Sequence, residues 1–226
     1  MDEQELIRRA GQGNEDAFEQ LVNAYEKPVY NLCLRMCGDR DEAFDLSQDT
    51  FIKAWHAISM FHGESKFKTW LMRIASNTCI DHLRKKKRQN VITMTDLDRE
   101  DEDKPLERQI ADYSTDPAVL AEKAQDHEAV REAMNRLPDQ DRLILSMRAI
   151  EDMSYQEIGD ALQLQPGTVK SRISRAREKI RRSLEGNFFE GSSSRKGMSR
   201  SAVAAGTCPL VAKVTNLWRN STQFRI

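Results

Sequence analysis

Basic and small polar side chains are concentrated between residues 166 and 182, in a stretch with a single acid, Glu178. The basic residues of this stretch are Lys170, Arg172, Arg175, Arg177, Lys179, Arg181 and Arg182. Arginine and lysine bind phosphate oxygens and guanine edges, and serine adds hydrogen bonds to either. This chemistry is typical of a helix that lies in the major groove of DNA.

The residues before this stretch predict a shorter helix that supports it. Ser154 and Glu157 have the spacing of a capping box, in which the hydroxyl and the carboxylate each accept a hydrogen bond from an otherwise unpaired backbone amide. Met153 and Ile158 occupy the positions of a hydrophobic staple. Pro166 is tolerated in the first turn of the next helix, where its missing amide would be unpaired in any case. The sequence therefore predicts a helix-turn-helix motif.

One side of the second helix is apolar, with residues at helical spacing that we expect to be buried: Val169, Ile173, Ala176 and Ile180. The rest of the helix surface is left to phosphates and base edges. An amphipathic helix pair with a solvated basic face is the alternative interpretation. The cap, the turn proline and the charge asymmetry together favour DNA binding.

Charge is separated along the chain rather than spread evenly. The chain has 226 residues and a net charge of −1. A basic run occupies residues 84–88, whereas residues 96–126 hold eleven acids and four bases. Such separation is typical of a protein with different surfaces for different partners. Because there is neither an apolar N-terminal signal segment nor an apolar run of ~20 residues, we expect a cytoplasmic protein without membrane insertion.

Apolar periodicity predicts an all-α protein of two small helical domains. Residues 90–126, rich in acids and containing two prolines, are expected to form a flexible acidic linker between the domains. Pro28 is expected to kink or divide the first long helix. The helices expected in the first domain span residues 14–37, 41–58 and 67–87.

Acidic residues recur every four positions in the second of these helices, at Asp41, Asp45 and Asp49, with Gln48 beside them. Spaced carboxylates could bind a divalent metal, form a solvated face or serve as a polar docking surface for another protein. The large apolar residues of the same helix are expected together on one side: Phe44, Phe51, Trp55 and Ile58.

The cysteines form neither a CxxC pair nor a disulfide framework. Cys33 and Cys37 lie one helical turn apart, so two metal ligands are conceivable. Buried reduced thiols are favoured, because no further ligands lie close in sequence. We therefore expect no metal and no cofactor.

Aromatic residues are interleaved with bases around the start of the third helix. Phe61, His62, Phe67 and Trp70 lie close in sequence to Lys66, Lys68 and Arg73. Aromatic rings stack on unpaired bases while cations hold the backbone, so this pattern favours binding of single-stranded nucleic acid. The alternative is that the aromatic residues, Phe67 and Trp70 in particular, belong to the core.

Three segments in this order resemble an extracytoplasmic-function (ECF, group IV) RNA polymerase sigma factor of the sigma-70 family. DLSQDTFIKAWHAI (45–58) is similar to region 2.2, which docks on the polymerase β′ clamp helices. FKTWLMRIASNTCIDHLRKKKR (67–88) is similar to regions 2.3 and 2.4, which melt and read the −10 promoter element. Residues 137–184 are similar to region 4, whose helix-turn-helix reads the −35 element. The similarity covers most of residues 14–184.

The resemblance implies a sigma factor without catalysis of its own, whose partners are core RNA polymerase (the β′ clamp helices and the β flap), promoter DNA and an anti-sigma factor. The implied polymerase-binding residues are Asp45, Leu46, Gln48, Asp49, Phe51 and Trp55. The implied −10 residues are Phe61, His62, Ser65, Lys66, Lys68, Trp70, Arg73, Asn77, Arg84 and Lys85. The implied −35 residues are Ser154, Gln156, Thr168, Lys170, Ser171, Arg172, Ser174, Arg175 and Arg177.

The expected domains are a region 2 domain over residues 1–89, the linker over 90–126, a region 4 domain over 127–185 and a basic tail over 186–226. The tail departs from the family pattern and could be a disordered basic arm, a binding segment for a regulator or the product of a reading-frame change. The main alternative function is a helix-turn-helix regulator that binds an operator without polymerase. A metal-dependent nucleic-acid enzyme built on the spaced aspartates is more distant, because no base or nucleophile accompanies them.

Overall fold

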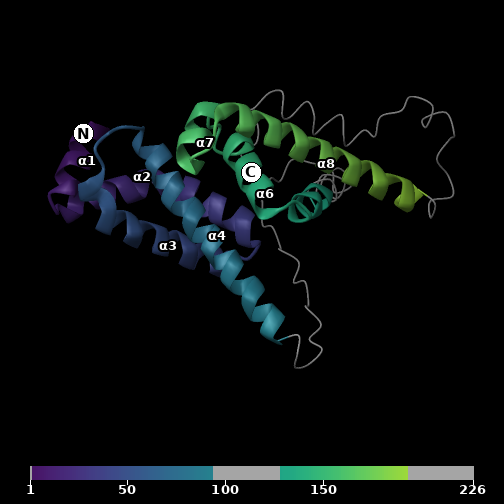
Figure 1. Cartoon of the computed structure of the whole chain (residues 1–226). Coiled ribbons are helices and arrows are strands. Elements are labelled where there is room, and N and C mark those ends of the chain that lie inside the picture. Colours follow the sequence, from purple (N-terminus) through teal and green to yellow (C-terminus); the bar gives the residue numbers. More distant parts are fainter. Residues whose placement is uncertain (1, 94–127, 193–226) are drawn as a thin grey trace, which may run out of the picture.

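The computed structural model describes residues 2–93 and 128–192, and every regular element in these ranges is a helix (Figure 1). The expected all-α class is confirmed for this part of the chain. Residues 90–93 of the expected acidic linker form the last turn of α4, and residues 186–192 of the expected basic tail continue α8; the rest of both segments lies outside the described residues. The elements are α1 (Glu3–Gly11), α2 (Glu15–Cys37), α3 (Arg40–Ala57), the short η1 (Ile58–Met60), α4 (Phe67–Thr93), a helical segment over 128–135, α6 (Asp139–Ala149), α7 (Tyr155–Leu162) and α8 (Pro166–Ser192).

The first unit packs α3 and α4 against α2, with α1 laid across α2 and η1. Leu32 of α2 and Leu71 of α4 are almost fully buried in its core. The helix expected over residues 14–37 is present and is not divided at Pro28. A proline inside a helix frees the carbonyl four residues earlier, here that of Ala24. Because Ala24 lies on the exposed side of α2, that carbonyl is positioned to bond to water.

Local chemistry sets the boundary between α2 and α3. Gly38 ends α2 with a left-handed φ of 80°, and its amide donates to the carbonyl of Leu34. The next residue, Asp39, caps α3 by accepting hydrogen bonds at 2.9 Å from the amides of Asp41 and Glu42. Glycine adopts this backbone conformation without a steric penalty, so the chain reverses within two residues.

The helix-turn-helix forms as expected. The Ser154 hydroxyl accepts from the Glu157 amide at 3.2 Å, and the Glu157 carboxylate accepts from the Ser154 amide at 2.8 Å. Gln163 closes the turn in a left-handed conformation with φ of 55°. The apolar side predicted for α8 is buried throughout: Val169, Ile173, Ala176 and Ile180.

The two units lie against each other, α4 beside α7 and α2 beside α6 (Figure 1). Arg142 of α6 is buried at this boundary, with 8 % of its surface exposed. Its guanidinium donates to the carbonyl of Met36, in the last turn of α2, at 3.0 Å. It also bonds Asp139 at 3.1 Å. This contact between residues 106 positions apart fixes the second unit on the end of α2.

Two glycines of the helix-turn-helix provide a matched test of how tightly its turn packs against α7. A Cβ added at Gly159 would lie 2.6 Å from the backbone carbonyl oxygen of Leu164, whereas one at Gly167 meets nothing within 4 Å. We expect Gly159→Ala to lower the free energy of unfolding by about 1–3 kcal/mol through overpacking of the turn. Gly167→Ala should leave it unchanged or slightly higher, because alanine favours helix. Urea unfolding followed by circular dichroism measures both, and equal stability of the two variants would contradict the tight turn.

Candidate polymerase and nucleic-acid interfaces

The outer face of α3 carries the acids expected to bind polymerase. Asp45, Gln48 and Asp49 are exposed there. Leu46 differs from the expectation: it is 5 % exposed and belongs to the core, so it supports the face from inside. Trp55 is half-buried and packs on the Phe18 ring with centroids 4.9 Å apart.

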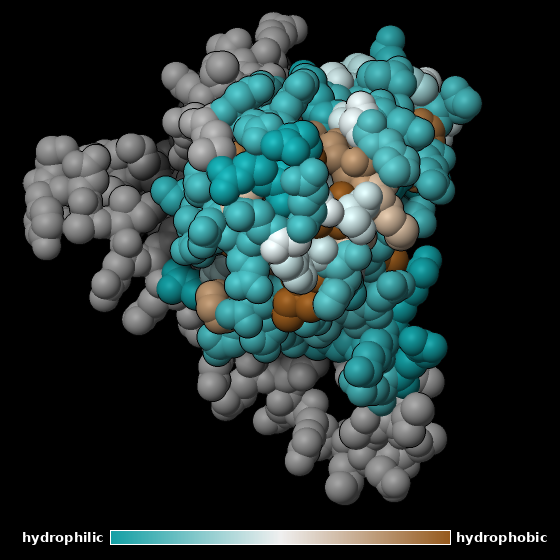
Figure 2. All heavy atoms as spheres, turned by 90° about the vertical axis from the view of Figure 1, so that its left-hand side faces the viewer, coloured by the Kyte–Doolittle hydropathy of each residue, from teal (hydrophilic) through white to brown (hydrophobic). Residues whose placement is uncertain are grey.

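Two apolar residues of this face were misplaced or missed by the sequence analysis. Phe44 is 52 % exposed, so it does not share a side with buried Ile58 as expected. Ile52, at 56 % exposure, was not singled out. Spacing of four residues puts Phe44, Gln48 and Ile52 on one stripe, a signal that was available in the sequence. We define the α3 face as the exposed residues Phe44, Asp45, Gln48, Asp49 and Ile52. In the described part of the chain, Met60 of η1 is also an exposed large hydrophobic residue, at 68 %. The face shown in Figure 2 is largely hydrophilic, with a few hydrophobic residues among the polar ones.

The aromatic residues at the start of α4 form a packed cluster. Phe67 and Trp70 are 3 % and 8 % exposed, with ring centroids 5.4 Å apart. Phe61 covers both and is half-buried, and Tyr25 meets Phe67 from α2. The structure therefore places Trp70 in the core, where it holds the loop over residues 61–66 against α4 and presents little surface for stacking.

The polar and basic residues expected at the −10 strand lie around this cluster and along α4. His62, Lys66 and Asn77 are exposed, as are Arg84 and Lys85 further along α4. The remaining three, Ser65, Lys68 and Arg73, are half-buried. The Lys68 ammonium donates to the backbone carbonyl of Glu151 at 2.8 Å and lies 3.3 Å from its carboxylate. Burial raises the pKa of Glu151, and Lys68 opposes that rise.

The residues expected at the −35 element fall into two groups. Ser154, Gln156, Lys170, Ser171, Ser174 and Arg175 are exposed, whereas Thr168, Arg172 and Arg177 are half-buried. Arg172 donates to the side-chain oxygen of Gln140 at 2.7 Å. Burial lowers the pKa of Arg177, an effect that leaves an arginine charged at neutral pH. The Ser154 hydroxyl is engaged in the capping box, so its role is in the helix start.

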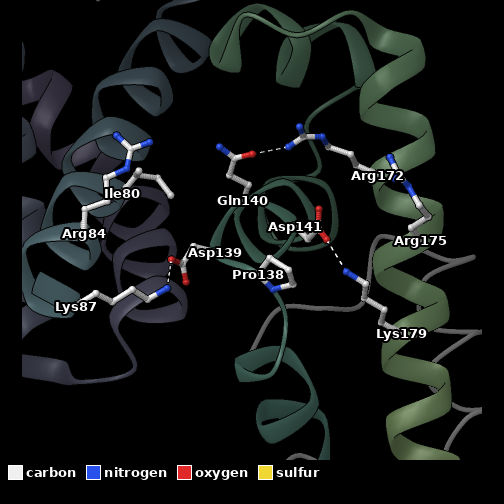
Figure 3. A pocket seen from close by; sticks show the side chains of 10 residues that line it. All are labelled: Ile80, Arg84, Lys87, Pro138, Asp139, Gln140, Asp141, Arg172, Arg175 and Lys179. Atoms are coloured by element: carbon white, nitrogen blue, oxygen red, sulfur yellow. Dashed lines mark hydrogen bonds and ion pairs between the residues drawn. The ribbon is translucent and has the colours of Figure 1, made fainter. Parts of the chain in front are cut away.

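A groove of about 500 Å³ separates α4 from α6 and α8 (Figure 3). Cations line both walls, with Arg84 and Lys87 on α4 facing α8 across the start of α6. Lys87 pairs with Asp139 at 2.6 Å, and Lys179 pairs with Asp141 at 3.1 Å. The lining residues are Ile80, Arg84, Lys87, Pro138, Asp139, Gln140, Asp141, Arg172, Arg175 and Lys179. Five cations and two acids give this lining a net charge of +3.

Within residues 2–93 and 128–192, no three potential ligands are grouped to hold a metal ion, and the spaced aspartates of α3 do not converge. The three cysteines in this part of the chain are free thiols: Cys33 and Cys79 are buried with sulfurs 3.7 Å apart, and Cys37 is half-buried. Burial raises the pKa of Cys37 to about 11, so this thiol is protonated at neutral pH. These features agree with the interpretation of buried reduced thiols.

Both helical units of the chain match the sigma-70 family. Sigma-70 region 2 matches residues 21–89, and Sigma-70, region 4 matches residues 127–180. Neither description is that of an enzyme. No helix in the described ranges is both long and apolar enough to cross a membrane.

Individual relatives show to which group of sigma factors the chain belongs. The chain is 36 % identical over 181 residues to the ECF RNA polymerase sigma factor SigW of Bacillus subtilis, covering 79 % of this chain and 94 % of SigW. It is also 36 % identical to the RNA polymerase sigma-H factor of Pseudomonas aeruginosa, over 81 % of this chain and 94 % of that protein. The chain belongs to the ECF RNA polymerase sigma factors, which confirms the family suggested by its sequence.

Two solved structures share the fold. CnrH in complex with the cytosolic domain of CnrY is 27 % identical, with a TM-score of 0.57 over 80 % of this chain and 96 % of that one. The sigma factor RpoE in complex with the anti-sigma factor NepR from Bartonella quintana is 24 % identical and shows the fold alone, with a TM-score of 0.58 over 74 % and 96 %.

Glu157 gives the interface between the units a measurable pH dependence. The Lys66 ammonium, 2.8 Å away, and the Ser154 amide lower the pKa of Glu157 to about 2. A carboxylate whose folded pKa is depressed stabilises the fold above its unfolded value of ~4.3, and loses that contribution as pH falls toward 2. We expect Glu157→Gln to be less stable at neutral pH and to lose less stability between pH 5 and 2. Thermal unfolding across this range, with an NMR titration of the carboxyl, checks it; a Glu157 pKa near 4.3 would contradict the pairing.

Proposed function

We propose that this sigma factor directs core RNA polymerase to specific promoters by reading their −10 and −35 elements and by promoting melting. The observation that carries the proposal is the separation of surfaces: an acidic and apolar face on α3, and basic surfaces on α4 and α8. The acidic and apolar face of α3 suits a protein partner, and the basic surfaces of α4 and α8 suit a nucleic acid. The chain performs no catalysis in this proposal, acts in the cytoplasm and needs no cofactor.

The α3 face is the polymerase-binding surface. Asp45, Gln48 and Asp49 supply charge and hydrogen bonds, and exposed Phe44 and Ile52 supply the apolar contact. Apolar residues surrounded by polar ones are typical of interfaces, in which a few buried anchors contribute most of the binding energy. The expected partner element is the β′ clamp helices. Phe51 and Trp55, half-buried, hold the helix at the correct angle by packing inward.

Promoter DNA is bound by the other two surfaces. His62 and Lys66 lie in the loop before α4, where an unpaired −10 base can be captured beside the aromatic cluster, and Asn77 is exposed in the third turn of α4. Capture of an unstacked base offsets the cost of a few kcal/mol for unstacking it. Lys170, Ser171 and Arg175 are exposed on α8 for the −35 major groove.

Two further partners belong to the proposal. Region 4 contacts the β flap of polymerase, which holds the −35 reader in place. An anti-sigma factor is the other partner. The sigma factor RpoE, which shares the fold of this chain, was solved in complex with the anti-sigma factor NepR, and the proposal extends this to the chain by analogy of fold. Residues 1–89 and 127–185 are the two functional domains, and residues 90–126 connect them.

Run-off transcription tests the proposed function. Core polymerase with this chain, on a library of promoter fragments, should give transcripts that start at defined sites and are absent without the chain. The alignment of active fragments should reveal a −10 and a −35 element. Tight binding of duplex by the chain alone, with neither transcripts nor core binding, would instead indicate a polymerase-independent operator-binding regulator.

A pair of single substitutions tests the division of labour. We expect Asp49→Ala to weaken binding to core polymerase about tenfold, because it truncates an interface residue. Arg172→Ala should spare core binding and weaken −35 recognition about tenfold. Fluorescence anisotropy with labelled chain measures the first effect, and competition between intact and scrambled −35 duplexes in the holoenzyme measures the second. Equal losses of core binding in both variants would contradict separate surfaces.

A further inference from the structure

Carboxylates of region 4 lie on the lysines of α4 and of the loop before it. Lys66 pairs with Glu157 at 2.8 Å, Lys68 bonds Glu151, and Lys87 pairs with Asp139 at 2.6 Å. These contacts join residues 91, 83 and 52 positions apart. They run from the first turn of α4 almost to its end. Region 4 therefore covers α4 along its length rather than touching it at one point.

The buried guanidinium of Arg142 shows that this arrangement is a specific one. A charged group is stable in the interior only when acceptors satisfy it, and Arg142 finds its acceptors in the Met36 carbonyl of α2 and in Asp139. The negative end of the α2 dipole at Met36 adds to the attraction. Asp139 links this anchor to the surface, because it also binds Lys87.

The region 4 carboxylates that bind these lysines resemble the phosphate groups that the lysines are proposed to bind in DNA. A phosphate of the DNA backbone would present an anionic oxygen to the same ammonium groups. Lys66 and Lys68 are among the proposed −10 contacts, and Glu157 and Glu151 occupy them. The groove beyond, at about 500 Å³, has the size of a small-molecule site.

We propose that region 4 is an intramolecular inhibitor of −10 strand binding, in which Glu151, Glu157 and Asp139 occupy the lysines of α4 in place of phosphates. This inference rests on the proposed function of the α4 surface. The Lys66–Glu157 and Lys87–Asp139 pairs are partly exposed and individually weak, whereas the Glu151 side chain is buried, and the +3 lining of the groove opposes closure. Opening also releases Arg142 from the Met36 carbonyl, so the closed state gives way only when polymerase binds region 2 and region 4 at separate places. Lys170, Ser171 and Ser174 remain exposed, so inhibition falls on the −10 surface.

Zero-length crosslinking of the full-length chain tests the closed state. A carbodiimide joins a lysine to a carboxylate only when the two are in contact. We expect mass spectrometry to identify Lys66–Glu157 and Lys87–Asp139 crosslinks, which decrease at least severalfold on addition of core polymerase or of a −10 single strand. Absence of both crosslinks in the free chain would overturn the closed state, even if run-off transcription succeeded. The two proposals therefore fail separately.

Binding of a labelled −10 non-template single strand by the free chain tests the inhibition. We expect the double variant Glu151→Gln with Glu157→Gln to bind about three- to tenfold more tightly than wild type, the gain expected from releasing two weak ion pairs. The control is Asp160→Asn with Glu178→Gln, which removes the same charge from region 4. Asp160 bonds Gln156 on its own helix, and Glu178 pairs with Arg181 and Arg182, so neither holds α4.

The two variants have different predicted outcomes. Tighter binding by the first variant alone supports inhibition, with retained helicity and cooperative unfolding as the check on folding. Equal gains in both variants would mean a general charge effect and would overturn the inference. Asp139→Asn removes the Lys87–Asp139 pair and leaves the capping box of Ser154 and Glu157 intact. We expect it also to tighten binding of the −10 strand. If wild-type crosslinks persist unchanged in the presence of a saturating −10 strand, region 4 and the strand do not compete, and the inference fails.

Discussion

A guanidinium group cannot be buried without acceptors, and Arg142 satisfies this constraint by crossing between the two units. Its bond to the Met36 carbonyl at 3.0 Å joins the start of the region 4 core to the last turn of α2. Removal of the acceptor would leave an uncompensated charge in the interior, which is among the more costly changes that a protein can suffer. This contact fixes α6 on the end of α2, and the ion pairs of Lys66, Lys68 and Lys87 add to it in placing the helix-turn-helix beside α4.

Once α6 is placed, the charges around it form a single system. Asp139 serves both Arg142 and Lys87, and Asp141 holds Lys179 of α8. Cations suited to DNA are thus neutralised by neighbouring carboxylates rather than left to repel one another across the groove. The same cations can serve two states, because a phosphate and a carboxylate satisfy an ammonium group in similar ways. The chain trades one set of anions for another when promoter DNA is bound.

Sequence reasoning succeeded where the cause was local. The capping box of Ser154, the apolar stripe of α8 and the helix boundaries near Gly38 follow from spacing within a few residues. It failed where another element decides the outcome: α1 was not expected, because Leu6 and Ala10 form too short a stripe to stand out. Periodicity also grouped Phe44 on one side with Phe51, Trp55 and Ile58, and nothing in α3 alone tells which side α2 and α4 cover. The Lys66–Glu157 pair, 91 residues apart, has no local signal at all.

The α3 face and the closed arrangement together suggest an order of events. Phe44, Asp49 and Ile52 stay exposed while region 4 lies on α4, so polymerase can bind region 2 without first opening the chain. Binding at the α3 face holds the chain on polymerase. A second contact, between polymerase and region 4, can then form only if region 4 leaves α4. Because the exposed ion pairs on α4 are individually weak, the cost of opening lies mainly in releasing Arg142 from the Met36 carbonyl, and the two polymerase contacts together must offset it. The −10 lysines then become free at the moment when polymerase is present to use them, and the free chain binds single-stranded nucleic acid more weakly than the opened one.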